Sequence, residues 1–165
     1  MKARNANFDF ITELLNDTRK FIRMKKTELA IENFKTLNCA QAVLLSHAEE
    51  LKLDRITALR IALGFGGGMC MGETCGAVTG AYMVLGLKAK FEEKTIAEIK
   101  ADTKLAVRRF NELFIAKHGS VQCKKLLGVD ISTPEGSAEV NEKGLFDTTC
   151  VALVVSATEI LEKEF

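Results

Sequence analysis

Five cysteines are the side chains of this sequence best suited to chemistry: Cys39, Cys70, Cys75, Cys123 and Cys150. A deprotonated cysteine is both a metal ligand and a nucleophile toward disulfides. No two of the five are spaced as C-x-x-C, so the sequence contains no zinc-ribbon, thioredoxin-type or haem-attachment motif. An odd number of cysteines also argues against a framework of structural disulfides. The spacing indicates free thiols, a metal site or redox chemistry.

Two of these cysteines lie in the segment GFGGGMCMGETCGAVTG, residues 64–80. Its glycines allow the backbone to approach another group closely, and their N–H groups can donate to sulfur. The segment contains G-x-G-x-G, but it lacks the preceding strand and the later acidic residue of a dinucleotide-binding motif, and G-K-[ST] does not occur. We therefore expect the segment to shape a site around Cys75. The glycines expected to contribute are Gly66, Gly67, Gly68 and Gly76.

The elements that position the cysteines are expected to be helices. The chain has one proline and long stretches of mixed charged and apolar residues, which is typical of a helical protein. The pattern predicts helices over residues 8–24, 27–37, 39–53, 55–63, 75–87, 95–118, 121–128 and 148–165. Segment 129–144 is polar and rich in turn-forming residues. The predicted fold is a single-domain, all-α bundle of about six to eight helices. The glycine-rich loop precedes a buried central helix, and residues 1–26 form an N-terminal extension to a cysteine domain over residues 27–165.

Four of the cysteines fall at predicted helix starts. Their predicted N-cap residues are Asn38, Thr74, Ser120 and Asp147. Cys39 and Cys75 follow their caps directly, and Cys123 and Cys150 follow three residues later. The unpaired N–H groups and positive dipole of a helix start stabilise a thiolate. Cysteine is also a small hydrophobic residue, however, so spacing alone leaves a purely structural role open.

Composition limits the function classes. The chain has 165 residues, 47% of them hydrophobic and 27% charged, with a net charge of +1. This balance predicts one soluble domain and argues against an electrostatic nucleic-acid binder. The longest apolar run is too short to insert in a membrane, and the N-terminal sequence does not resemble a secretory signal. We therefore expect a cytoplasmic protein.

Four segments of the sequence resemble the redox-active family named C_GCAxxG_C_C. They are GFGGGM, GETCGAVTGAYMVLGL, HGSVQCKKLLG and GLFDTTCVALVVSATEILE. The early cysteine lies in NCAQAVLL, and the match extends from about Thr27 to Leu161. The family pattern has one early cysteine, a CGAxxG-like motif and two later cysteines, which correspond here to Cys39, residues 75–80, Cys123 and Cys150. Thr74 departs from the glycine in the family label, and Cys70 is a fifth cysteine. A similar module occurs in split-Soret cytochromes, where it is linked with an iron–sulfur site beside haem.

The resemblance implies a redox role in a small helical protein, and three functions remain open. In the first, Cys39, Cys75, Cys123 and Cys150 bind an iron–sulfur cluster, most simply [2Fe–2S], with zinc or no cofactor as alternatives. The chain would then exchange electrons with a redox partner protein. In the second, Cys75 or Cys39 attacks a disulfide and Cys70 resolves the product. In the third, the cysteines belong to the core of a helical interaction module. The high apolar fraction and the helix expected over residues 8–24, which could pack on a partner, make a homodimer a further expectation.

Overall fold

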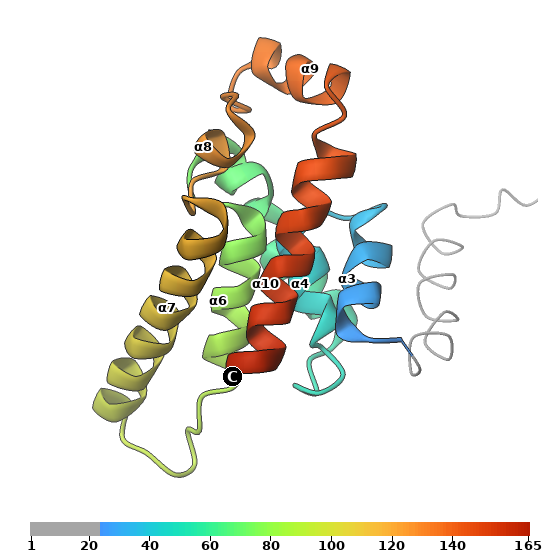
Figure 1. Ribbon diagram of the computed structural model, residues 1–165. Helices are drawn as coiled ribbons and strands as arrows, with labels where there is room; N and C mark the ends of the chain where they lie inside the picture. The colour runs from blue at the N-terminus through green and yellow to red at the C-terminus, as the bar shows by residue number, and fades with distance from the viewer. Residues whose placement is uncertain (1–23) are drawn as a thin grey trace, which may run out of the picture.

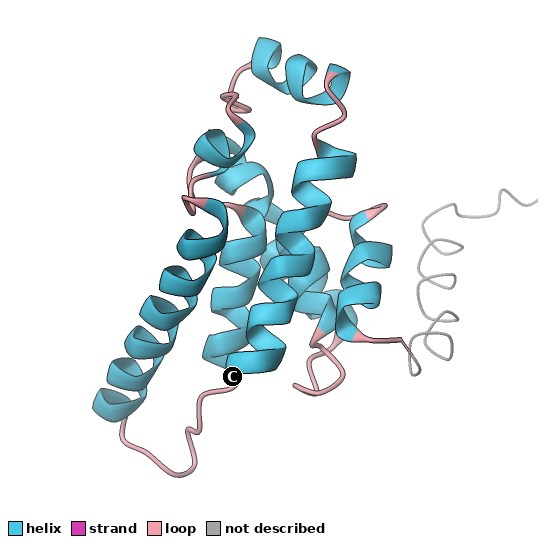
Figure 2. Cartoon of the chain, in the orientation of Figure 1, coloured by secondary structure: helices cyan, strands magenta, loops and turns pink. Residues whose placement is uncertain are grey.

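The computed structural model describes residues 24–165, which form an all-α bundle (Figures 1 and 2). Eight α-helices lie in this part of the chain: α3 (Lys26–Phe34), α4 (Cys39–Ser46), α5 (Arg55–Ala62), α6 (Gly76–Leu87), α7 (Ile96–His118), α8 (Cys123–Leu127), α9 (Pro134–Glu142) and α10 (Val151–Glu164). The predicted fold class is therefore confirmed. The helix expected over residues 8–24 lies outside the described residues, and the division into an extension and a domain stays a prediction.

The core forms where α4, α6 and α10 pack together. Every residue of α4 from Ala40 to Ser46 is buried, and most of α6 is buried as well. In Figure 1, α10 lies in front of α6 and α4, with α7 and α3 on the two outer sides. A methyl group on Gly80 would lie 2.7 Å from the carbonyl oxygen of Ala40, so α4 and α6 pack this closely only because residue 80 is glycine. The buried central helix expected after the glycine-rich loop is α6.

Helix ends follow local hydrogen bonding where the sequence signals it clearly. The side chain of Asn38 accepts from the Gln41 N–H while Gln41 accepts from the Asn38 N–H, which forms a capping box at the start of α4. Asp54 caps α5 by accepting from the Thr57 N–H, and Thr95 caps α7 by accepting from the Glu98 N–H. Gly119 ends α7 in the left-handed conformation, with φ of 79°.

Two helical predictions need correction. The helix expected to continue to residue 53 ends at Ser46, and the chain then turns through Lys52, which has a positive φ of 51°.

The polar segment 129–144 contains α9, although no helix was expected there. Thr133 caps α9 by accepting from the Gly136 N–H, and Pro134 occupies its first position. These are standard signals for a helix start, but the segment has too few apolar residues to show helical periodicity.

Candidate four-cysteine site

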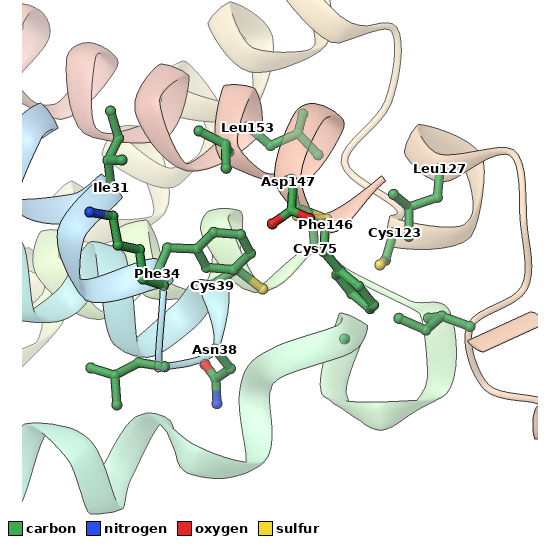
Figure 3. Close-up of a pocket in the computed structure, with 16 residues that line it drawn as sticks. Ile31, Phe34, Asn38, Cys39, Cys75, Cys123, Leu127, Phe146, Asp147 and Leu153 are labelled. Carbon is green, nitrogen blue, oxygen red and sulfur yellow. The ribbon is translucent and has the colours of Figure 1, made fainter. Parts of the chain in front are cut away.

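Four cysteines line one cavity of about 540 Å³, although they come from four separate elements. They are Cys39, Cys75, Cys123 and Cys150. Figure 3 shows the first three of them around the same space, with Phe34 and Phe146 beside them. Cys70 is exposed and does not belong to the cavity lining. The fold thus brings together the four cysteines of the predicted ligand set and separates the fifth from them.

Cys39 is the first residue of α4, and its sulfur is surrounded by donors. The Cys75 thiol donates to it, as do the backbone N–H groups of Gly67, Cys39 and Ala40. Burial opposes ionisation, but the donors outweigh it and lower the pKa of the Cys39 thiol to about 7. The same hydrogen bond, together with burial, raises the pKa of the Cys75 thiol well above its usual value. In this pair Cys39 is the thiolate and Cys75 the proton donor.

The glycine-rich segment lies directly against the Cys39 sulfur. Gly67, with φ of 59°, lines the cavity. Asn38 holds the segment in place, because its amide donates to the carbonyl oxygen of Leu63 at 2.9 Å. Asn38 also packs closely against Gly66, where an added methyl group would lie 2.6 Å from the Asn38 Cβ. A methyl group on Gly76 would overlap the Cys39 sulfur itself. Glycine at these positions therefore permits a contact that a larger residue would prevent.

A short backbone clasp joins Cys75 to Cys123. The Cys75 N–H donates to the carbonyl oxygen of Val121 at 2.8 Å, and the Cys123 N–H donates to that of Glu73 at 2.6 Å. Between these bonds, Thr74 and Gln122 form an isolated antiparallel bridge. The clasp fixes the starts of α6 and α8 relative to each other. An ion pair between the Glu73 carboxylate and the Lys124 ammonium, at 2.8 Å, lies beside it.

This clasp corrects two of the predicted caps. Thr74 is paired with Gln122 and cannot cap α6, so Cys75 is itself the N-cap residue. Ser120 accepts from the Gln122 N–H in a turn before α8, and Gln122 is the N-cap residue. Cys75 is therefore the N-cap residue of α6 and Cys123 the first residue of α8. Each differs from the expected position within its helix, but both remain at helix starts.

Cys150 reaches the cavity from a wide helical turn, Phe146–Cys150, that continues into α10. Its N–H donates to the carbonyl oxygen of Leu145 at 2.9 Å. Asp147 lies inside this turn and lines the cavity, so it does not cap α10 as predicted. The turn already has helical dihedral angles at Leu145, and the helical path begins before Asp147.

Burial sets the ionisation of the remaining two thiols. It raises the pKa of Cys123 to about 11 and that of Cys150 to about 12. We expected helix starts to favour thiolates at all four positions, but this holds only for Cys39. Removing a thiolate from water costs more free energy than the partial charges of a helix start supply. The thiolate is favoured only where several N–H or S–H groups donate to the sulfur, as they do at Cys39.

The rest of the cavity wall is mainly apolar. It consists of Ile31, Phe34, Leu37, Leu127, Ile131, Phe146, Val151 and Leu153, with Lys35, Asn38 and Asp147 as its polar side chains. Within the described residues, no three histidine, cysteine or acidic side chains are grouped closely enough to hold a single metal ion. The four cysteines instead share the lining of one cavity, in which Cys75 donates to Cys39. Cysteine thiolates in a largely apolar setting are the usual ligands of iron–sulfur clusters, so the donor set fits such a group.

The chain belongs to the family described as "Putative redox-active protein (C_GCAxxG_C_C)", which it matches over residues 37–164. The match includes all five cysteines and most of the cavity wall, and it confirms the resemblance drawn from the sequence. None of the curated proteins or solved structures is significantly similar to the chain.

The helices also bear on membrane insertion. Among the described residues, no single helix is long and apolar enough to cross a membrane. The helices Pro134–Glu142 and Phe146–Glu164, which are bent by 75° relative to each other, together have the length and apolar composition of a membrane span. Core helices of globular proteins can have the same length and composition.

Proposed function

We propose that this chain is an electron-transfer or redox-sensing protein that binds an iron–sulfur cluster through Cys39, Cys75, Cys123 and Cys150. The observation that carries the proposal is the shared cavity: four cysteines spread over more than one hundred residues line it, and the fifth does not. Four thiolates are a complete ligand set for a [2Fe–2S] cluster, which we favour.

The surrounding residues are suited to holding such a group. When bound, the cluster would supply one-electron exchange with a partner protein. The N–H groups of Gly67 and Ala40 would stabilise negative charge on the Cys39 sulfur, as they already do in the thiolate. Phe34, Phe146 and the aliphatic wall would limit the access of water. The backbone clasp would keep the Cys75 and Cys123 sulfurs at a fixed separation.

The test is the visible spectrum, with iron and acid-labile sulfide analysis, of protein purified without oxygen. We expect visible absorption and nearly equal amounts of iron and sulfide. Cys39→Ala, Cys75→Ala, Cys123→Ala and Cys150→Ala should each lose the absorption, whereas the matched control Cys70→Ala should retain it. A colourless wild-type protein without iron would overturn the proposal. Full iron content in Cys123→Ala would also overturn the proposal, because it would show that Cys123 is not one of the four ligands.

The hydrogen bond between Cys75 and Cys39 favours a second candidate, thiol–disulfide exchange. The Cys39 thiolate would attack a disulfide of a partner protein and release one partner thiolate. Cys75, after losing its proton to solvent, would attack the resulting mixed disulfide. The products would be a Cys39–Cys75 disulfide and a partner protein reduced by two electrons. The alternative in which Cys70 resolves the mixed disulfide stays a prediction.

Alkylation of metal-free protein tests this candidate. Mass spectrometry should find Cys39 to be the most rapidly alkylated cavity thiol, and mild oxidation should produce a Cys39–Cys75 disulfide. Cys75→Ser should abolish that disulfide, and Cys70→Ser should leave it unchanged. Slow alkylation of all four cavity thiols, with no disulfide between Cys39 and Cys75, would exclude this chemistry.

A further inference from the structure

Two amide side chains at the start of α4 form hydrogen bonds at both of their ends. The oxygens of Asn38 and Gln41 form the capping box, in which each accepts from the backbone N–H of the other. The Asn38 Nδ2 donates to the carbonyl oxygen of Leu63 at 2.9 Å. The Gln41 Nε2 donates to the carbonyl oxygen of Leu59, also at 2.9 Å. A capping box needs only the oxygens, which aspartate and glutamate also supply, so the two nitrogens have a second effect, which is to join α4 to α5.

These two bonds hold the end of α5 and the chain that follows it. Leu59 lies in the last turn of α5, and Leu63 follows the last residue of that helix directly. Carbonyl groups at the end of a helix lack partners within the helix, so donors from another element can hold them. Gln41 is 5% exposed, and loss of its bond would be costly because water does not replace the donor there. Two bonds four residues apart therefore set both the position and the direction of the chain as it enters the glycine-rich segment.

The chain that leaves α5 in this direction lies against the Cys39 sulfur. A methyl group on Gly76 would overlap that sulfur and would also lie 3.0 Å from the carbonyl oxygen of Phe65. The turn after α5 and the sulfur therefore meet at one point. Two residues later, the Gly67 N–H donates to the sulfur. The start of α4 thus carries both the Cys39 thiol and the side chains that hold one of its donors.

We propose that Asn38 and Gln41 are positioning residues of the four-cysteine site: by holding the end of α5, their amide nitrogens place the Gly67 N–H against the Cys39 sulfur. This placement belongs to the metal-free chain and does not depend on a cofactor. Its consequence for a cluster rests on the proposed function. A donor to a ligand sulfur stabilises the added negative charge of a reduced cluster, so the Gly67 N–H would raise the reduction potential.

Amide hydrogen exchange in the metal-free chain, measured by NMR, tests the placement. Asn38→Asp and Gln41→Glu each keep the oxygen of the capping box and lose the N–H that bonds to α5. Exchange at Gly67 should be at least about tenfold faster in both variants, whereas the backbone N–H of residue 41, which the cap still accepts, should exchange as slowly as in the wild type. Asn38→Ser, which caps without a charge, should accelerate exchange at Gly67 to the same extent.

The matched control is Asn111→Asp on α7. The Asn111 oxygen accepts from the Tyr82 hydroxyl, and aspartate keeps this bond, so exchange at Gly67 should match the wild type. Unchanged exchange at Gly67 in Asn38→Asp and Gln41→Glu would overturn the proposal. Equally fast exchange at residue 41 would also overturn it, because the variants would then act through the start of α4 and not through the bonds to α5.

Reduction potentials separate this result from the cluster proposal. In iron-loaded protein, Asn38→Ser should have a more negative potential than the wild type at equal iron content. Equal potentials would overturn the effect on the cluster. A wild-type chain without iron would overturn the cluster proposal alone, and hydrogen exchange at Gly67 would still decide the role of Asn38 and Gln41.

Discussion

A methyl group added to Gly76 would overlap the sulfur of Cys39, and it would lie 3.0 Å from the carbonyl oxygen of Phe65. The glycine after Cys75 is therefore required by a neighbour more than thirty residues away in the sequence. The same contact explains why Cys39 differs from the other cavity thiols. Its sulfur lies where the starts of α4 and α6 and the backbone of Gly67 converge, so donors stabilise its charge. At Cys75 the hydrogen bond that it donates to Cys39, together with burial, keeps the thiol protonated, and at Cys123 and Cys150 burial does so.

Gly76→Ala should therefore damage the site. We expect a loss of about 1–3 kcal/mol in the free energy of unfolding, the usual cost of overpacking, and, if the proposed cluster binds, loss of its iron. Urea denaturation and iron analysis measure the two effects. The control is Gly86→Ala on the same helix, where a methyl group meets nothing within 4 Å. It should stabilise the protein by about 0.5–1 kcal/mol, since alanine favours a helix more than glycine does. Equal stability of the two variants would contradict the proposed contact.

Individual residues were predicted from the sequence wherever the signal was local. Asn38 caps α4 as expected because the cap and its partner Gln41 are three residues apart. Thr74 was wrongly predicted as a cap, because its backbone pairs with Gln122, almost fifty residues later. The contact between Cys39 and Gly76 was likewise not visible in the spacing of residues. The family resemblance identified which four cysteines belong together, while the cavity and the single thiolate required the fold.

At the scale of elements, the turn over residues 68–72 and the clasp between residues 73–75 and 121–123 form one unit. At Gly68, with φ of 64°, an added Cβ would collide with both the Glu73 backbone and the Cys123 side chain. The ion pair between Glu73 and Lys124 is partly exposed to solvent and should contribute less than about 1 kcal/mol. Close backbone packing and the clasp hydrogen bonds, rather than this ion pair, should hold Cys75 and Cys123 in register.

Gly68→Ala tests this ranking. Its methyl group would lie 2.6 Å from the Glu73 nitrogen and 2.8 Å from the Cys123 Cβ. We expect a loss of about 3 kcal/mol in the free energy of unfolding, the sum of a left-handed backbone and overpacking. Gly119→Ala is the matched control, because Gly119 also has a positive φ but faces open space, so it should lose only about 1 kcal/mol. Similar losses in both variants, measured by urea denaturation, would show that the close packing at Gly68 contributes little to the free energy of unfolding.

The elements themselves differ in how far the sequence predicts them. The hydrophobic pattern predicts the bounds of α5, α6 and α7 to within one residue at each end. α9 was missed because few of its side chains are apolar: it is fixed by its cap and by Gly136, where a methyl group would overlap the carbonyl group of Asp130. The early end of α4 has a different cause. Ser46 and His47 turn their side chains back toward the carbonyl oxygen of Val43, and the chain leaves the helix there.

At the scale of the whole molecule, His47 connects that turn to the stability of the fold. It is 1% exposed, its Nδ1 lies 3.2 Å from the carbonyl oxygen of Val43, and its Nε2 is buried without a hydrogen-bond partner among the described residues. Burial, and to a lesser extent the charges of Lys26 and Lys88, lower the pKa of His47 to about 4, although Val43 and Glu50 oppose the shift. The folded protein thus keeps this imidazole neutral at pH values where the unfolded chain protonates it.

We therefore expect the free energy of unfolding to fall with pH in a defined window. Above pH 6.5, both states hold a neutral His47 and the fold has its full stability. Between pH 6.5 and about 4, the unfolded chain binds one more proton, so stability falls by up to about 3 kcal/mol and then levels off for this group. Urea denaturation across this window measures the slope.

The His47→Gln variant should lose most of that pH slope, because glutamine does not titrate. His118→Gln is the control: burial also lowers the pKa of His118, but this side chain is partly exposed and should contribute a smaller part of the slope. Glu50, whose pKa its ion pairs with Lys26 and Lys88 lower from 4.5 to about 2, destabilises the fold only as the pH falls through 4.5, where the unfolded carboxyl begins to bind a proton. The part of the slope above pH 4.5 is therefore the part that reports on His47. If the slope were unchanged in His47→Gln, carboxylates elsewhere would have to carry it, and His47 would not be the buried neutral group that links pH to folding.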